Sequence, residues 1–226
     1  MDRQPVLEGE RLVLRPLTEA DFAALYAVAS DRELWAVHPS HDRWQEPVFR
    51  EFFDDALAKG GALAIVDKAT CEVIGSSRFQ YCDRYEGEVL EIGWSFLARA
   101  CWGKGYNAEF KRLMLEYAFR HVERVVFRVG AGNVISRKAM ANIGGRLTGD
   151  SYVEERAGEP VEHVVYEITR DSTASSSGVI RSSRRALIIA SHSGSNFFHP
   201  AAYMKCLTLC LASSCDQAAR PMFRQP

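Results

Sequence analysis

Two glycines that flank a lysine, Gly103-Lys104-Gly105, form the most informative chemical pattern in this sequence. Residues 91–97 before them have the composition of a strand, and the residues from about 107 onward have the apolar spacing of a helix. The first turn of a helix presents backbone N–H groups that lack partners within the helix, and the helix dipole favours negative charge there. The sequence therefore predicts a phosphate or pyrophosphate site at this turn.

Two common phosphate-binding motifs do not fit this turn. Tyr106 stands where a P-loop has Ser or Thr after its lysine. Ala108 stands where the dinucleotide-binding fingerprint has its third glycine. We therefore expect a ligand with a different pyrophosphate.

The elements that must position this turn follow from the hydrophobic patterns along the chain. The patterns predict strands at about 11–16, 63–66, 73–79, 88–97, 125–129, 147–153 and 161–168. They predict helices at about 22–29, 47–59, 107–121 and 133–143. This order predicts a single mixed α/β (α+β) domain.

Charge divides the chain of 226 residues into two regions. Residues 1–171 hold 22 Lys and Arg against 28 Asp and Glu, whereas residues 172–226 hold 6 against 1. We interpret 1–171 as the folded domain and 172–226 as a Ser/Arg-rich, disordered tail of unassigned role. The acidic balance of the domain argues against a nucleic-acid partner.

Other features of the sequence limit the expected location of the protein in the cell and the cofactors that it could use. No signal pattern opens the chain and no apolar run is long enough to span a bilayer, so we expect a cytoplasmic protein without a membrane partner. The six cysteines include no C-x-x-C pair, and we expect no metal.

Residues from about 7 to 169 resemble the GNAT superfamily of acetyl-CoA-dependent N-acetyltransferases, in particular the branch that includes the ribosomal-protein N-terminal acetyltransferases. The resemblance rests first on Glu91-Ile92-Gly93-Trp94 followed by Gly103-Lys104-Gly105-Tyr106-Asn107-Ala108-Glu109. It rests second on Asn133-x-x-Ser136-x-x-x-Ala139-x-x-x-x-Gly144. The two patterns occur in the family's order, with one helix and one strand between them.

The resemblance implies a central mixed sheet of six to seven strands, with two parallel strands that splay apart and about four flanking helices. It implies that acetyl-CoA lies in the gap between the splayed strands and is the cosubstrate. The residues implied in its binding are Phe96, Leu97, Ala98, Trp102, Gly103, Lys104, Gly105, Tyr106, Asn107 and Asn133. Two positions depart from the family pattern: Ala100 replaces a Gln or Arg, and Asn107 replaces a small residue.

The resemblance also implies the catalytic groups. Glu91 matches the carboxylate that serves as general base, although a glutamate on a strand also pairs readily with a basic neighbour. Glu154 and Glu155 are the alternative bases. Ser136 matches the general acid, although its hydroxyl could instead cap the helix that follows Asn133.

The acceptor is the least determined part of the expected reaction. The family builds the acceptor pocket from the first two helices and the closing hairpin, which here supply Trp35, His38, His41, Asp42, Trp44, Tyr81 and Tyr152. We expect direct acetyl transfer to a primary amine, on a protein N-terminus or a small molecule, in a ternary complex. The alternative is a non-catalytic acyl-CoA-binding module. The expected assembly is a monomer or a homodimer.

Overall fold

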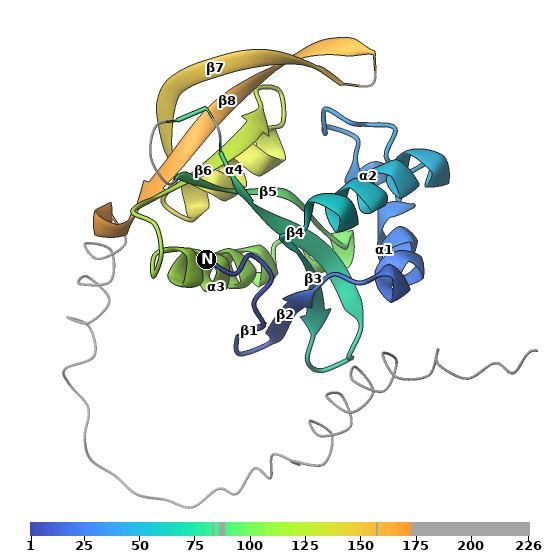
Figure 1. Ribbon diagram of the computed structural model, residues 1–226. Helices are drawn as coiled ribbons and strands as arrows, with labels where there is room; N and C mark the ends of the chain where they lie inside the picture. Colours follow the sequence, from blue (N-terminus) through green and yellow to red (C-terminus); the bar gives the residue numbers. More distant parts are fainter. Residues whose placement is uncertain (83, 86–88, 157, 173–226) are drawn as a thin grey trace, which may run out of the picture. The chain divides into compact units, whose positions relative to one another are not determined.

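The computed structural model describes residues 1–82, 84–85, 89–156 and 158–172 (Figure 1). The expected tail, 172–226, lies outside the described residues apart from Ser172. No helix in the described part of the chain is long and apolar enough to cross a bilayer.

One sheet of eight strands forms the centre of the domain, in the spatial order β1-β2-β3-β4-β5-β6-β8-β7. Every neighbouring pair is antiparallel except β5 and β6, which are parallel. The strands span Leu7–Glu8 (β1), Leu12–Pro16 (β2), Ala62–Asp67 (β3), Val73–Tyr81 (β4), Val89–Leu97 (β5), Arg124–Gly130 (β6), Arg146–Arg156 (β7) and Glu159–Thr169 (β8).

The parallel strands β5 and β6 separate part-way along the sheet. They pair only from Val89 to Glu91, opposite Arg124 to Val126. Beyond Glu91, β5 continues beside β4 as far as the pair Leu97 and Gly75, with an irregular register opposite 76–78. Trp94 has a φ of 53° in this stretch. Among the described strands, the end of β5 therefore has no partner on its β6 side, as the expected splay requires.

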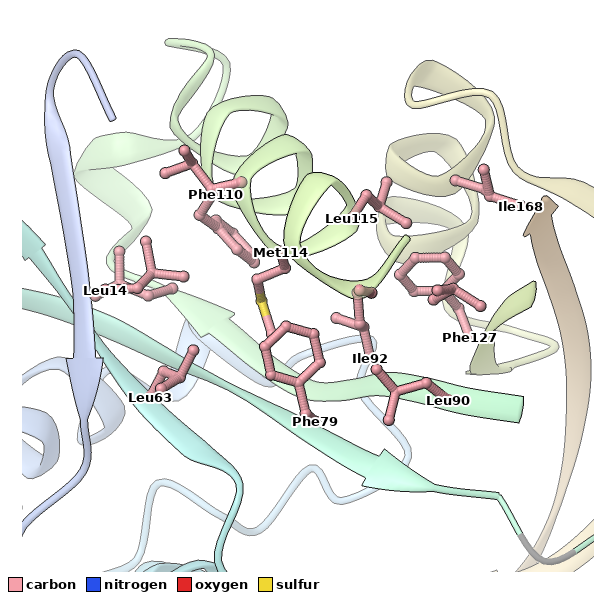
Figure 2. Close-up of a cluster of buried hydrophobic side chains, with 14 of the residues drawn as sticks. Leu14, Leu63, Phe79, Leu90, Ile92, Phe110, Met114, Leu115, Phe127 and Ile168 are labelled. Carbon is pink, nitrogen blue, oxygen red and sulfur yellow. The ribbon is translucent and has the colours of Figure 1, made fainter. Parts of the chain in front are cut away.

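Helices cover both faces of the sheet. On one face, α3 (Tyr106–Ala118) and α4 (Val134–Asn142) pack on a core that includes Phe79, Ile92 and Phe127 (Figure 2). On the other face, α1 (Phe22–Ala29) and α2 (Glu46–Lys59) bury a second, aromatic cluster. Three short 3₁₀ helices complete the fold: η1 (Glu19–Asp21), η2 (Arg32–Leu34) and η3 (Arg99–Cys101).

Local signals explain where these helices begin and end. Pro47 lies in the first turn of α2, where its missing N–H costs nothing, and Gly60 follows the last turn with a φ of 67°. The side chain of Asn133 caps α4 by accepting the N–H of Ser136 at 3.0 Å.

The predicted fold class and order of elements are confirmed. The additional strand is β1, which extends the sheet from the expected six to seven strands to eight. It has two residues, paired opposite Val13 and Leu14 of β2. Two residues are too few to show an alternating pattern, so only its pairing reveals it.

Candidate active site

The turn between η3 and α3 is open to a ligand. Gly103 and Gly105 have φ values of 71° and 83°, in the left-handed region that favours glycine. A Cβ at Gly103 would have no heavy atom within 4 Å apart from its chain neighbours, so none of the described residues covers this backbone. The free N–H groups of the first turn of α3 follow directly. The turn has the conformation and the donors of an anion site.

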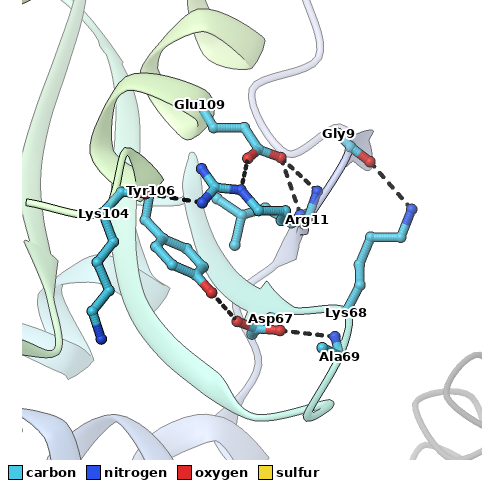
Figure 3. A network of polar contacts seen from close by, with 9 residues as sticks. Gly9, Arg11, Asp67, Lys68, Ala69, Lys104, Tyr106 and Glu109 are labelled. Atoms are coloured by element: carbon cyan, nitrogen blue, oxygen red, sulfur yellow. Dashed lines mark hydrogen bonds and ion pairs between the residues drawn. The ribbon is translucent and has the colours of Figure 1, made fainter. Parts of the chain in front are cut away.

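Polar contacts hold this turn against β2 and β3 (Figure 3). Arg11 donates from Nη1 to the carbonyl of Lys104 at 2.9 Å and from Nε to Glu109 at 2.8 Å. Glu109 also accepts the backbone N–H groups of Arg11 and Leu12. The hydroxyl of Tyr106 donates to Asp67 at 2.7 Å, and this bond raises the pKa of Tyr106. The conformation of the turn is thus fixed from outside it.

The other residues expected along the cofactor path have different surroundings. Phe96 packs its ring into the aromatic cluster under α1 and α2, so only its backbone is open to a ligand. Trp102 donates its Nε1 to the carbonyl of Leu97 at 3.0 Å, which ties the turn to the end of β5. Ala98 is the N-cap of η3, and the Lys104 side chain is exposed.

A pocket of about 180 Å³ lies where β5 and β6 separate. Four of the residues expected in catalysis or cofactor binding line it together: Glu91 from β5, Asn107 from α3, and Asn133 and Ser136 from the start of α4. The expected cofactor residues from 96 to 106 do not line it. They form the strand end and the glycine turn just before Asn107 in the chain.

Glu91 is nearly inaccessible, with 3% of its surface exposed. Its Oε2 forms an ion pair with Nη2 of Arg128 at 2.6 Å. A Cβ at Gly93 would come within 3.1 Å of Oε1, so glycine at this position leaves room for the carboxylate. Burial raises the pKa of Glu91, while Arg128 opposes this effect, and the net result is a raised value. Glu91 therefore lines the pocket and also pairs with a cationic neighbour, and its role as general base stays a prediction.

The two alternative bases lie on β7. Glu154 forms ion pairs with Arg156 at 2.5 Å and with Arg128 at 3.7 Å. Glu155, on the opposite face of the strand, is exposed and does not line the pocket.

Ser136 lines the pocket with a hydroxyl that has no partner among the described residues. Its backbone N–H is bound by Asn133, but its Oγ makes no hydrogen bond there. The alternative role of the hydroxyl as a helix cap is therefore not what this geometry shows, because Asn133 supplies the cap.

Lys111 is the buried group that sequence reasoning missed. It is 2% exposed, lines the pocket, and donates from Nζ to the hydroxyl of Ser95 at 2.7 Å. No carboxylate pairs with it within the described chain. Burial lowers its pKa to about 7, with a small opposing effect from Glu91. Its position one helical turn after Asn107, and four residues before the buried Leu115, was the available signal.

Only part of the expected acceptor pocket is assembled. His38 and Tyr152 line the pocket, whereas Trp35, His41, Asp42, Trp44 and Tyr81 do not. Trp35 is a core residue whose indole donates to the carbonyl of Ala29 at 2.7 Å. Three arginines that the sequence did not indicate, Arg43, Arg128 and Arg156, line it instead.

Comparison with known proteins identifies the family. A family model of the acetyltransferase (GNAT) domain matches residues 11–146. An uncharacterized N-acetyltransferase, p20 of Bacillus licheniformis, is 31% identical over 144 residues, which are 61% of this chain and 80% of that protein. The chain belongs to the GNAT family of acetyltransferases. As a member of that family it is an N-acetyltransferase in the general sense.

Solved structures share the fold of this acetyltransferase. A GCN5-related N-acetyltransferase from Brucella melitensis aligns with a TM-score of 0.67 at 20% identity, over 79% of this chain and 85% of its own. RimJ of Mycobacterium smegmatis, in complex with CoA-disulfide, aligns with a TM-score of 0.62 at 18% identity, over 80% and 95%. At these identities the likeness concerns the fold alone.

Family membership implies acetyl-CoA as the acetyl donor, and the residues present fit it. The unpaired end of β5 offers backbone groups to an extended chain, and the exposed Gly103 turn offers N–H donors to a pyrophosphate. Within the described residues, no group of three or more His, Cys, Asp or Glu side chains could hold a metal ion.

Proposed function

We propose that this protein transfers the acetyl group of acetyl-CoA to a primary amine, directly and within a ternary complex. The observation that carries the proposal is the meeting of three features: the unpaired end of β5, the glycine turn, and a pocket that holds a buried carboxylate. When bound, acetyl-CoA supplies the acetyl group as a thioester. All other steps are assigned below to residues of this chain.

In this proposal the cosubstrate is bound mainly by backbone. Phe96, Leu97 and Ala98 pair with its extended arm, and the amides from Trp102 to Asn107 bind its pyrophosphate. Lys104 adds a positive charge beside the pyrophosphate. Asn107 and Asn133 contribute side-chain amides, and their position in the pocket lining supports this role.

Glu91 is the proposed general base. A carboxylate with a raised pKa accepts a proton more readily than an ordinary one, and Glu91 has that property because it is buried. It takes one proton from the ammonium group of the acceptor, so that the nitrogen lone pair can form the new amide bond. Arg128 keeps the side chain oriented.

Ser136 is the proposed general acid. As the thioester bond breaks, its hydroxyl donates a proton to the departing sulfur and regains one from the nitrogen of the new amide. The net products are an N-acetylated acceptor, CoA as a thiol, and one proton that leaves from Glu91. The unpartnered hydroxyl supports this role.

The acceptor class in this proposal is a protein N-terminus or a small-molecule amine. A role close to the ribosomal-protein branch rests on the motif resemblance, and RimJ of Mycobacterium smegmatis shares the fold at 18% identity. We also propose a cytoplasmic monomer or homodimer without a nucleic-acid or membrane partner, in which 1–171 is the catalytic domain and 172–226 is a tail. The acidic balance of residues 1–171 supports the absence of a nucleic-acid partner.

The first test measures acetyl-CoA binding by thermal shift, and then CoA thiol release with a panel of amines. We expect stabilisation by acetyl-CoA and CoA, and thiol release that falls as the pH drops through the raised pKa of Glu91. Glu91→Gln should lower kcat by about a hundredfold or more and leave acetyl-CoA affinity within about twofold, because only proton transfer is lost.

Matched variants make this test specific. Glu162→Gln removes an exposed carboxylate on β8 outside the pocket and should keep full activity. Ser136→Ala should lower kcat with little change in acetyl-CoA affinity. Binding without turnover for every amine would favour the non-catalytic acyl-CoA-binding module. No stabilisation by acetyl-CoA or CoA would exclude both functions.

A further inference from the structure

The pocket carries more positive than negative charge. Its lining includes three guanidinium groups, Arg43, Arg128 and Arg156, and one carboxylate, Glu91, whereas Lys111, with a pKa of about 7, is only partly charged at neutral pH. Glu154 is close by and pairs with two of the arginines, Arg128 at 3.7 Å and Arg156 at 2.5 Å. The acidic balance of residues 1–171 as a whole is thus reversed inside the pocket.

Arg43 stands out because no carboxylate neutralises it. Nη2 donates to the hydroxyl of Ser40 at 3.1 Å, and no carboxylate among the described residues lies within ion-pair distance. Asp42, its neighbour in the chain, affects its charge only from farther away. Burial, followed by the charge of Arg156, lowers the pKa of Arg43 to about 9, so the guanidinium is still charged at neutral pH.

Packing holds Arg43 in place at the pocket wall. Its guanidinium carbon lies 4.2 Å from the ring centre of Phe52 and 5.1 Å from that of Trp35. The same loop is anchored nearby, because Pro39 fills the space that a side chain at Gly130 would occupy. A guanidinium that lies over aromatic rings directs its N–H edge away from the ring faces, and at Arg43 Ser40 uses part of that edge through Nη2.

The two histidines of the pocket add no negative charge and little positive charge. Burial, with further effects from Arg43 and Arg156, lowers the pKa of His38 to about 3. Burial also lowers the pKa of His163, whose ring stacks on Tyr152 at 5.3 Å. Both rings are therefore neutral at pH 7, and the arginines determine the charge of this wall.

The cationic wall lies on the acceptor side of the pocket. Arg43 comes from the loop that precedes α2, and Arg156 from the end of β7 in the closing hairpin (Figure 1). Neither element belongs to the glycine turn or to the unpaired end of β5. A ligand group that Arg43 binds would therefore belong to the acceptor rather than to the pyrophosphate of the donor.

We propose that the acceptor amine also carries an oxyanion, a carboxylate or a phosphate, which Arg43 binds together with Arg156. The inference rests on the proposed acetyl transfer and names its substrate class. A guanidinium donates two parallel N–H bonds to a carboxylate or phosphate, a geometry that an amine cannot use. Polyamines and aminoglycosides, which bring several positive charges, are disfavoured by the same wall.

The test compares acceptors that differ only in the anion. The pairs are 4-aminobutyrate with 4-aminobutyramide, and aminoethyl phosphate with ethanolamine, and putrescine serves as a dicationic amine. We expect kcat/KM to be higher for each anionic member by about tenfold to a hundredfold. The pair with the larger difference in kcat/KM shows whether the site prefers a carboxylate or a phosphate. A peptide with Asp at its second position tests whether the acceptor is a protein N-terminus whose side chain supplies the carboxylate.

Arg43 variants tie the preference to this side chain. Arg43→Gln should raise KM by about tenfold or more for the acceptors that carry a carboxylate or phosphate. For 4-aminobutyramide and ethanolamine, which lack that group, kcat/KM should change little. Arg43→Lys should recover only part of the preference, because it keeps the charge and loses the paired donors. Arg112→Gln removes an exposed arginine of α3 outside the pocket and should leave the preference intact.

A binding measurement separates this inference from the proposed function. Product analogues need no turnover, so 4-acetamidobutyrate and 4-acetamidobutyramide are compared by thermal shift in the presence of CoA. Preferential stabilisation by the anion, lost in Arg43→Gln, supports the site even if the catalytic roles are wrong. Equal use of neutral and anionic acceptors, or an anion preference that survives Arg43→Gln, would overturn the inference while acetyl transfer stands.

Discussion

At the scale of single residues, Lys111 combines complete burial with a charge that it can lose near neutral pH. Its Nζ has one hydrogen-bond acceptor, Ser95, and the rings of Phe110 and Phe127 lie about 5 Å away, at 5.0 and 5.2 Å. Among the described residues, the charge that acts on its pKa is that of Glu91, which opposes the larger effect of burial. Such a group costs stability when it is protonated, because burial disfavours the ammonium form.

This cost predicts a pH dependence of folding with a definite sign. The folded-state pKa of Lys111 is lowered to about 7, whereas an unfolded lysine keeps a value of about 10.4. Between these values the unfolded chain binds more protons, so the contribution of Lys111 to stability rises with pH. Its contribution should increase by about 3 kcal/mol between about pH 6 and pH 9.

Lys111→Met is the variant that measures this contribution. It should stabilise the fold most below pH 7. The free energy of unfolding of the variant, measured by urea titration, should therefore change less between pH 6 and pH 9 than that of the wild type. Lys138→Met, at an exposed site on α4, is the control and should leave the pH profile unchanged. Identical profiles for wild type and Lys111→Met would mean that Lys111 keeps an ordinary pKa.

At the scale of elements, the contact between α3 and β2 determines how well the glycine turn is held. Glu109 accepts three hydrogen bonds from Arg11 and Leu12, two of them from backbone N–H groups. Arg11 in turn binds the carbonyl of Lys104 within the turn. The site for the pyrophosphate therefore depends on a strand that is distant in the sequence.

Glu109→Gln should weaken both the fold and the binding of acetyl-CoA. An amide keeps the shape but loses the charge-assisted bonds, so we expect a loss of about 1–3 kcal/mol in unfolding free energy. We also expect several-fold weaker acetyl-CoA binding by calorimetry, because the turn is less ordered before it binds. Glu116→Gln, which breaks an exposed ion pair with Arg112 on the same helix, should cost less than about 0.5 kcal/mol. Equal losses in both variants would contradict a role for Glu109 in the turn.

At the scale of the whole molecule, the eight strands and helices α1 to α4 lie between residues 7 and 169, and the described chain ends in three helical residues, 170–172. Their buried side chains form the clusters on the two faces of the sheet without any residue beyond 168. A chain that ends at Asp171 should therefore fold with a melting temperature within about 3 °C of the full chain, corresponding to less than about 1 kcal/mol.

The truncated chain should also keep its acetyl-CoA binding and thiol release. Calorimetry and a thiol assay on both lengths give this comparison. A truncated chain that aggregates, or that folds but loses activity, would mean that residues 172–226 take part in the domain.

The sequence by itself determined the glycine turn, the order of the elements and the family, because each depends on residues close together in the chain. A strand, a turn and a helix follow one another here, so Gly103 and Gly105 lie at the start of a helix, and this placement depends only on neighbouring residues. Glu91, Asn133 and Ser136 were predicted because the segments that contain them resemble the family's patterns. The catalytic roles of Glu91 and Ser136 and the cofactor-binding role of Asn133 stay predictions.

Only the tertiary structure decided which side chains share the pocket and what charge they leave there. Arg43, Lys111 and Arg156 come from a loop, a helix and a strand that are far apart in the sequence, and none of them is unusual in its own segment. Asn107, a departure from the family pattern, also became a pocket residue only once α3 was packed on the sheet. Burial and the distance between charges set the electrostatics of a site, and both are properties of packing rather than of sequence.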